Sequence, residues 1–483
     1  MGATSRPPSI AHLEVLVDVG MIGLGAMGRN FVLNMAEHGF GVVGFDRDAA
    51  QVAALRAEAG GRPIRTSDAL ADLVRDLPRP RVLFLLVPAG APVDAVLREL
   101  LPLLSQGDLI IDGGNSHFHD TDIRLKALSE RRIEYLGVGV SGGSEGARHG
   151  PSLMPGGSRD AYERVRPLFE AVAARVNGEP CVAWCGPGSA GHYVKMVHNG
   201  IEYGLMQLIA EAYDFSHRGL GMTNDELHDV FDGWNQTELK SFLIEITARI
   251  FEQPDPATGS RLIDVILDEA RQKGTGMWTS QEAMALQVPV PTIDMAVAMR
   301  DLSVLKAERE AASKLLGTSP RQHDGKHEVG PRELRNALFA ATIMTYAQGM
   351  ALLRRGSTVH GYSLNLSEIA RIWRGGCIIR AAVLDQIRAT FEATSELTNL
   401  LLDPGLFAEI QHRQSDLRLV VRKAAEQAIP VPGLMASLAY WDSYCSVSLP
   451  ANLIQAQRDY FGAHTYERID AKGTFHTVWH NEG

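Results

Sequence analysis

The sequence has little of what would direct a chain to a membrane, a disulfide-rich fold or a nucleic acid. Its 483 residues include only four cysteines, too few for a disulfide scaffold, and nothing at metal-ligand spacing completes a site beside Cys181 and Cys185. No run approaches the ~18 apolar residues of a membrane span, and the first residues lack the hydrophobic stretch of a signal peptide. The net charge of −10 argues against a nucleic-acid partner. We therefore expect a cytoplasmic protein that binds no membrane, no nucleic acid and no metal.

The first part of the chain has the pattern of a parallel sheet covered by helices. With 483 residues and 45% hydrophobic content, the chain exceeds what one core holds, so we expect two or three domains. Short, nearly continuous apolar runs are typical of buried parallel strands, and they occur at residues 15–19, 41–45, 82–87 and 109–112. Helical patterns lie between them, as at residues 30–38 and 93–104. This alternation predicts a Rossmann-type doubly wound α/β domain over residues 1–188.

Long helical periods replace this alternation from about residue 189. They predict helices over residues 237–252, 293–316, 331–355, 367–392 and 415–428. Thr223 followed by Glu226 has the spacing of a capping box, Gly317 and Gly356 are expected helix ends, and residues 317–330 are an expected exposed loop. We therefore expect a large all-α domain over residues 189–448 and a C-terminal tail over 449–483, extended after Phe461.

One predicted helix of the second part carries polar groups where a buried helix should be apolar. The polar residues have the i, i+3, i+4, i+7, i+8 spacing of a single helical face, and they are Lys195, His198, Asn199, Glu202 and Tyr203. Lys195 and Glu202 are two turns apart, roughly 10 Å along the axis, which leaves room for a small molecule between a base and an acid. A solvated surface face would have the same spacing, but the flanking segments are strongly apolar. Since buried charge needs a reason, this face is a candidate active site.

A glycine-rich turn in the first part predicts a dinucleotide site. The hexapeptide follows an apolar strand and opens a helix, and it consists of Gly23, Leu24, Gly25, Ala26, Met27 and Gly28. Its glycines allow a tight turn and the close approach of a pyrophosphate to the helix N-terminus. Asp46 ends the next strand, where a carboxylate accepts hydrogen bonds from ribose hydroxyls and repels a 2′-phosphate. Arg47 can stack on adenine or pair with a phosphate, and Asp48 adds a second negative charge.

Further motifs follow in order along nearly the whole chain. They read Ile111-Asp-Gly-Gly-Asn115-Ser, Val140-Ser-Gly-Gly-Ser-Glu-Gly-Ala, Pro151-Ser-Leu-Met-Pro-Gly-Gly, Lys195-Met-Val-His-Asn-Gly-Ile-Glu-Tyr, Gln272-Lys-Gly-Thr-Gly, Trp373-Arg-Gly-Gly-Cys-Ile-Ile-Arg and Gln457-Arg-Asp-Tyr-Phe-Gly-Ala-His-Thr-Tyr. From about residue 20 to residue 467 the chain thereby resembles the decarboxylating 6-phosphogluconate dehydrogenases in their long two-domain form.

The resemblance implies an activity and assigns catalytic roles. It implies the reaction of the pentose phosphate pathway that oxidatively decarboxylates 6-phosphogluconate to ribulose 5-phosphate and CO2, with reduction of NAD or NADP. It makes Lys195 the general base and Glu202 the general acid. The chemistry agrees, because oxidation of a hydroxyl needs a base, and a lysine serves only if its pKa is lowered enough to leave it neutral. After CO2 leaves, Glu202 would protonate the enediol carbon, and no metal is needed.

The resemblance also implies binding residues. For the substrate phosphate these are Lys273, Arg300 and Arg458, with Thr275, Tyr203 and His464. For the carboxylate and hydroxyls they are Asn115, Ser141, Gly142, Gly143, His198 and Asn199, and Asn115 would also meet the nicotinamide ribose. The coenzyme crevice adds Val87, Pro88 and Ala89 to the glycine turn and to Asp46, Arg47 and Asp48. In this family the tail, with Arg458 and His464, reaches the substrate of the neighbouring subunit, which implies a homodimer with shared active sites.

The choice of coenzyme and two alternative functions stay open at this point. NADP-using members of the family carry Asn-Arg followed by Ser or Thr where this chain has Asp46-Arg47-Asp48, and Pro88 replaces a common lysine. We therefore expect NAD or NADP, with NAD favoured. One alternative is another β-hydroxyacid dehydrogenase acting on a smaller, unphosphorylated acid, which would lack the three basic residues and the tail. The other is a non-catalytic dinucleotide-binding dimer, against which Lys195 and Glu202 both count.

Overall fold

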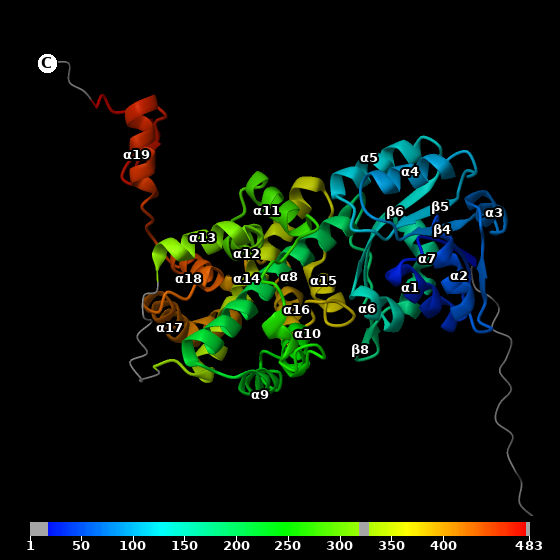
Figure 1. Cartoon of the computed structure of the whole chain (residues 1–483). Helices are drawn as coiled ribbons and strands as arrows, with labels where there is room; N and C mark the ends of the chain where they lie inside the picture. Colours follow the sequence, from blue (N-terminus) through cyan, green and yellow to red (C-terminus); the bar gives the residue numbers. More distant parts are fainter. Residues whose placement is uncertain (1–17, 318–327, 480–483) are drawn as a thin grey trace, which may run out of the picture.

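The fold is a helix-covered parallel sheet followed by a large helical body and a projecting C-terminal segment (Figure 1). The computed structural model describes residues 18–317 and 328–479. Residues 15–17 of the first expected strand and most of the expected loop after Gly317 lie outside the described residues. The predicted fold class is confirmed: a Rossmann-type sheet comes first and an all-α region follows it. Among the described residues, no helix is both long enough and apolar enough to cross a membrane.

The main sheet has the strand order β3-β2-β1-β4-β5-β6-β7. The strands are β1 (Asp18–Ile22), β2 (Gly41–Phe45), β3 (Ile64–Thr66), β4 (Val82–Leu85), β5 (Leu109–Asp112), β6 (Glu134–Ser141) and β7 (Ser152–Gly157). Strands β1 to β6 are parallel, and β7 pairs antiparallel with β6. The expected strands at 41–45 and 109–112 coincide with β2 and β5, because strands covered on both faces are apolar throughout.

Helices cover both faces of this sheet (Figure 1). They are α1 (Ala26–Glu37), α2 (Ala49–Glu58), α3 (Leu70–Arg75), α4 (Ala91–Leu100), α5 (Phe118–Ser129), α6 (Gly143–His149) and α7 (Arg159–Val172). Two separate cores result. One joins Phe31 and Phe169 across Phe84 of β4, and the other packs helices such as α4 against Leu83 on the opposite side. A short hairpin of β8 (Arg175–Val176) and β9 (Glu179–Pro180) leads to the helical body.

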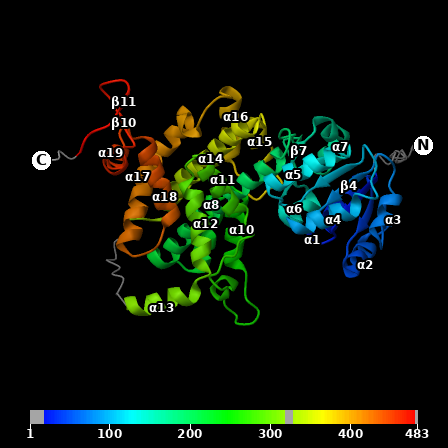
Figure 2. The same cartoon turned by 90° about the horizontal axis from the view of Figure 1, so that it is seen from above.

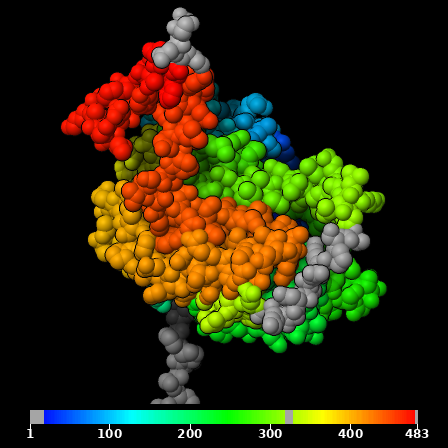
Figure 3. Space-filling view, turned by 90° about the vertical axis from the view of Figure 1, so that its left-hand side faces the viewer, coloured from blue at the N-terminus to red at the C-terminus, as the bar shows by residue number. Residues whose placement is uncertain are grey.

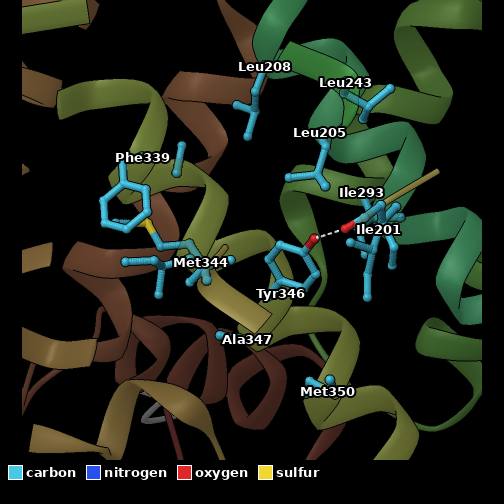
Figure 4. Close-up of a cluster of buried hydrophobic side chains, with 14 of the residues drawn as sticks. Ile201, Leu205, Leu208, Leu243, Ile293, Phe339, Met344, Tyr346, Ala347 and Met350 are labelled. Atoms are coloured by element: carbon cyan, nitrogen blue, oxygen red, sulfur yellow. Dashed lines mark hydrogen bonds between the residues drawn. The ribbon is translucent and has the colours of Figure 1, made fainter. Parts of the chain in front are cut away.

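The helical body is built around two long helices. These are α8 (Ala190–Asp214) and α14 (Pro331–His360), which lie side by side (Figures 1 and 2). Around them stand α9 (Asn224–Trp234), α10 (Phe242–Glu252), α11 (Thr275–Ala285), α12 (Pro291–Ser303), α13 (Lys306–Leu316), α15 (Leu366–Ile372), α16 (Val383–Ala393), α17 (Pro404–Glu426) and α18 (Pro432–Tyr444). Figure 4 shows their common core, where the buried Tyr346 hydroxyl donates to the Ile379 carbonyl at 2.6 Å. The predicted capping box at Thr223 and Glu226 starts α9.

Two helices predicted as continuous are interrupted in the structure. The helix expected over residues 293–316 is divided into α12 and α13, because Arg309 donates to the Ser303 carbonyl at 2.8 Å and takes the acceptor that a continuous helix would use. The helix expected over residues 367–392 is divided into α15 and α16 by a loop in which Gly376 adopts φ +66°. A Cβ on Gly376 would lie 2.6 Å from the Gly150 carbonyl oxygen, so this glycine serves a backbone contact with the first domain.

The C-terminal segment is not the extended tail that was expected. Residues 451–462 form α19 (Ala451–Gly462), and a hairpin of β10 (Tyr466–Glu467) and β11 (Thr474–Phe475) follows it. This segment projects from the helical body (Figures 1 and 3). The apolar side chains of Leu453, Ile454 and Phe461 are 60%, 59% and 73% exposed. An exposed apolar surface of this kind is typical of an interaction site.

The expected helix end at Gly356 is also wrong, and the reason gives a testable prediction. Gly356 lies inside α14, where an added Cβ would be 2.1 Å from the Tyr193 hydroxyl oxygen. Helix propensity alone would favour Gly356→Ala by about 1 kcal/mol, but overpacking typically costs ~1–3 kcal/mol. We expect Gly356→Ala to lower the melting temperature. The matched control is Gly233→Ala in α9, where a Cβ meets no atom within 4 Å and should stabilise. Equal stability of the two variants would contradict this packing account.

Candidate functional site

Each of the three glycines in the turn at the start of α1 has a different structural role. Gly23 has φ +100°, and a Cβ on it would lie 2.4 Å from the Leu86 carbonyl oxygen. A Cβ on Gly28 would lie 2.0 Å from the Gly23 carbonyl oxygen, so this glycine lets the helix approach the turn. A Cβ on Gly25 would meet no protein atom within 4 Å. The open space at Gly25 adjoins the N-terminus of α1, where an anionic pyrophosphate is favoured by free N–H groups.

A cavity of 320 Å³ lies beside this turn. Its lining includes Gly23, Gly25, Asp46, Arg47, Val87, Pro88 and Glu99. The Asp46 carboxylate accepts a hydrogen bond from the Leu24 N–H at 2.6 Å and another from the Asp48 N–H at 2.9 Å. Asp48 in turn caps α2 by accepting the Ala50 N–H at 2.9 Å. Arg47 forms an exposed ion pair with Glu99 at 2.5 Å. The cavity can hold the ribose end of a dinucleotide, and its rim carries more negative than positive charge.

Close backbone packing brings α8 onto the sheet. A Cβ on Gly139 of β6 would lie 2.4 Å from the Lys195 Cβ, and one on Gly156 of β7 would lie 2.2 Å from the Gly191 N atom. Only glycines allow the helix and the two strands to come this close. The contact places the predicted polar face of α8 at the end of β6, where Ser141 is the last strand residue.

The polar face is buried, and hydrogen bonds hold it. Lys195, His198, Asn199 and Tyr203 are 6%, 0%, 8% and 6% exposed, and the Glu202 side chain is 20% exposed. The Ser141 hydroxyl lies 3.2 Å from His198 Nε2, and His198 Nδ1 lies 3.1 Å from Asn199 Oδ1. The side-chain amide of Asn199 donates to the Thr275 hydroxyl at 3.1 Å. This chain of contacts joins β6, α8 and α11. The opposite face is buried as well, which agrees with the strongly apolar flanking segments in the sequence.

Burial shifts the pKa values of the two candidate catalytic groups in opposite directions. It lowers the pKa of Lys195, against the opposing charges of Glu202 and Cys377. It raises the pKa of Glu202, against the opposing charges of Lys195 and Arg300. Among the described residues, 18–317 and 328–479, the Lys195 ammonium has no hydrogen-bonding or ion-pair partner. An amine that is readily neutral and a carboxyl group that readily keeps its proton therefore share one face, as a base and an acid require.

Two cations, Arg300 and Lys273, have no carboxylate partner in the described part of the chain. Arg300 of α12 stacks on Tyr203, with its guanidinium carbon 3.4 Å from the ring centroid. Lys273 is exposed and lies just before α11, whose first residue is Thr275. Neither forms an ion pair within residues 18–317 and 328–479, whereas Arg418, for example, pairs with Asp442. Their charge therefore stays available to an anion such as a phosphate.

Asp112 is a functional position that sequence reasoning missed. This fully buried residue ends β5, and its carboxylate accepts hydrogen bonds from the Gly114 N–H at 3.0 Å and the Ser116 hydroxyl at 2.6 Å. Its carbonyl accepts from His192 Nε2 at 3.1 Å. Asp112 therefore fixes the loop that carries Asn115 and ties it to α8, one turn before Lys195. The sequence did contain a signal, since Asp112 lies inside the motif Ile111-Asp-Gly-Gly-Asn115-Ser.

The structure brings most of the predicted site residues together but not all. Gly142 and Gly143 start α6 beside Ser141, and both have positive φ, +105° and +63°. Arg458 and His464 lie on α19 and the turn after it, on the projecting segment away from α8 (Figure 1). Among the described residues, no group of three or more histidine, cysteine, aspartate or glutamate side chains is placed to hold a metal ion. The free thiols of Cys181, Cys185 and Cys377 are buried.

Comparison with known proteins gives this geometry a family. One family model, described as the NAD binding domain of 6-phosphogluconate dehydrogenase, matches residues 18–186, and a second, described as the C-terminal domain of 6-phosphogluconate dehydrogenase, matches residues 191–479. The chain belongs to the 6-phosphogluconate dehydrogenase family. The resemblance expected from the sequence motifs is confirmed.

Individual members of the family match over nearly their whole length. The decarboxylating 6-phosphogluconate dehydrogenase of Synechococcus elongatus is 53% identical, covering 96% of this chain and 99% of the relative. The NADP(+)-dependent enzyme of Bacillus subtilis is 49% identical, covering 95% of this chain and 98% of the relative. The Plasmodium falciparum 6-phosphogluconate dehydrogenase structure, described in complex with NADP+ and with 6-phosphogluconate, superposes with a TM-score of 0.92 at 43% identity, covering 96% of this chain and all of that one.

The electrostatics of the polar face of α8 give a prediction about Lys195. The Glu202 charge favours the ammonium form of Lys195, so Glu202→Gln should lower the Lys195 pKa further. The acylation rate of Lys195, followed against pH by peptide mass spectrometry, should reach its plateau at a lower pH in the variant. Acylation of the exposed Lys472 is the internal control and should not change. A Lys195 profile that is unchanged or moves to higher pH would show that the two groups do not interact in this way.

Proposed function

We propose that this chain catalyses the oxidative decarboxylation of 6-phosphogluconate to ribulose 5-phosphate and CO2, with NAD or NADP as hydride acceptor. The observation that carries the proposal is the burial of Lys195 and Glu202 on one face of α8, with their pKa values shifted in opposite directions. The full-length matches to decarboxylating 6-phosphogluconate dehydrogenases support it. The predicted alternative, a dehydrogenase of a smaller unphosphorylated acid, would have no use for Lys273 and Arg300, which form no ion pair with any described residue.

The proposed proton transfers follow from the order of bond changes. Lys195, whose pKa burial lowers, takes in its neutral form the proton of the C3 hydroxyl as that carbon is oxidised. A bound nicotinamide supplies the acceptor for the hydride. In the resulting 3-keto acid, the C1–C2 bond breaks, CO2 leaves, and the bonding electrons move toward the C3 oxygen. Protonated Lys195 then donates a hydrogen bond to that oxygen. Glu202, whose pKa burial raises, delivers a proton from its protonated form to the carbon that lost CO2, giving ribulose 5-phosphate.

The proposed substrate site places the two ends of the acid on different elements. The phosphate would be held by Lys273, Arg300, Thr275 and Tyr203, which lie where α8, α11 and α12 meet. The carboxylate and hydroxyls would be held by the residues at the end of β6 and on the polar face of α8, together with Asn115. Residues 1–188 would bind the coenzyme, and residues 189–448 would bind the substrate and form the dimer.

The tail, residues 449–483, is proposed to complete the site of a second subunit. Arg458 and His464 lie on the projecting segment and not at the α8 face of their own chain (Figure 1). The exposed apolar side chains of α19 support docking onto another copy. We therefore propose a homodimer in which each tail supplies Arg458 and His464 to the partner's substrate phosphate. The cytoplasmic location and the lack of a nucleic-acid partner stay predictions from composition.

The proposed coenzyme is NAD or NADP, with NAD favoured. Asp46 lines the cavity, Asp48 follows two residues later as the N-cap of α2, and Arg47 is already paired with Glu99. A 2′-phosphate would therefore meet two carboxylates and one partly neutralised cation. The Bacillus subtilis relative is NADP(+)-dependent and the Plasmodium falciparum enzyme is described in complex with its cofactor NADP+, so both coenzymes need to be tested.

The experiment that tests the function measures reduced coenzyme and CO2 together after addition of 6-phosphogluconate. We expect equal amounts of both products, and faster reduction of NAD than of NADP. Lys195→Ala should still bind coenzyme but turn over at least ~100-fold more slowly, because one acid–base group has gone. Faster reduction of NADP would overturn the coenzyme preference alone. No reduction with either coenzyme, or full activity of Lys195→Ala, would overturn the proposed function.

A further inference from the structure

One amide side chain links the two tail residues that are proposed to bind phosphate. Gln455 lies on α19, one turn before Arg458. Arg458 Nη1 donates to Gln455 Oε1 at 3.0 Å, and Gln455 Nε2 donates to the Thr465 carbonyl at 2.6 Å. Thr465 directly follows His464. The oxygen and the nitrogen of one side-chain amide therefore hold the guanidinium of Arg458 and the backbone of the turn that contains His464.

A buried carboxylate fixes the same turn from the other side. Asp459, 0% exposed, accepts hydrogen bonds from the Thr465 N–H at 2.9 Å, His476 Nδ1 at 2.9 Å, the Thr477 N–H at 3.0 Å and the Trp479 indole N–H at 2.9 Å. Burial alone would raise the pKa of Asp459, but these hydrogen bonds outweigh it and lower the pKa. Asp459 is therefore an ionised anchor that joins α19, the turn and the residues that follow β11.

The backbone of the turn needs this support. Ala463 and Thr465, on either side of His464, have φ values of +49° and +61°, a left-handed conformation that is costly for residues with a Cβ. A Cβ on Gly462 would lie 2.6 Å from His464 Nε2, so the imidazole lies back against the end of the helix. A strained turn persists only where its surroundings hold it, which is what Gln455 and Asp459 do.

We propose that Gln455 is a positioning residue that, with Asp459 as anchor, holds Arg458 and His464 in one geometry for a phosphate group of the substrate. The inference rests on the proposed function, in which the tail binds that phosphate. Holding the arginine before binding reduces the side-chain entropy lost when the phosphate is bound. An uncharged amide suits this task, since a carboxylate at residue 455 would neutralise the Arg458 charge that the phosphate needs.

The test compares variants of the full-length dimer. Gln455→Ala should raise the KM for 6-phosphogluconate up to ~10-fold, the scale of one immobilised side chain, and leave kcat within about twofold. Gln457→Ala is the matched control, because Gln457 is an exposed glutamine on the same helix, and its KM should not change. Gln455→Glu keeps the size of the side chain. The carboxylate cannot donate a hydrogen bond to the Thr465 carbonyl, and its charge would neutralise Arg458, so this variant should raise KM as well.

A second comparison separates failure of this inference from failure of the proposed function. Arg458→Ala should raise KM by more than Gln455→Ala does, and adding Gln455→Ala to Arg458→Ala should raise KM by a smaller factor than Gln455→Ala does alone, because only the support of the His464 turn is then left to lose. If Arg458→Ala leaves KM unchanged, the tail does not bind the phosphate and the proposed shared site fails. If Arg458→Ala raises KM but neither change at Gln455 does, or if those changes lower kcat alone, the positioning role is overturned.

Discussion

The burial of an amine and a carboxyl group on one face of α8 is the constraint on which the rest of the structure depends. Removing two ionisable groups from water costs free energy. In the described part of the chain, Lys195 has no ion-pair partner that would offset this cost. The cost is reduced when the amine is neutral and the carboxyl group is protonated. These are the states in which the first can accept a proton and the second can donate one. The same physics that makes this helix unfavourable therefore prepares it for acid–base chemistry.

The surrounding fold keeps these two groups in place from three directions. Glycines of β6 and β7 let α8 lie directly on the sheet, so Lys195 lies at the end of a strand. Asp112 ties the loop of Asn115 to His192, and Asn199 ties α8 to Thr275 at the start of α11. The coenzyme half and the helical half thus meet along one helix. The proposed contribution of the tail adds a fourth direction, from a second subunit.

Local patterns predicted a large part of this arrangement. The strands at 41–45 and 109–112, the glycine turn at residues 23–28 and the buried polar face of α8 each depend on short-range spacing, and all of them are found in the structure. The errors have a different origin. The break before α13 depends on the side chain of Arg309, and the break after α15 depends on backbone contacts of Gly376 with residue 150.

Other features that the sequence did not predict also depend on contacts between distant residues. The sequence predicts a helix end at Gly356, but this glycine lies inside α14, where the ring of Tyr193 packs directly against its backbone. The sequence predicts an extended segment after Phe461, because its few apolar residues show no periodicity. In the structure, Asp459 accepts hydrogen bonds from residues up to twenty positions away, and these hold the segment in a folded conformation. Gln455 has the appearance of an ordinary surface glutamine until the turn at His464 is seen. Such pairings leave no trace in local spacing.

The central claim, that Glu202 supplies a proton to carbon, can be measured without the oxidation step. Ribulose 5-phosphate is incubated with the protein and reduced coenzyme in D2O, and deuterium at C1 is followed by NMR. The account predicts exchange at C1 with the unaltered protein and exchange at least ~100-fold slower with Glu202→Gln, since the proton donor has been removed. Exchange at the same rate in both proteins would show that another group protonates this carbon, and would contradict the acid–base role assigned to the buried face of α8.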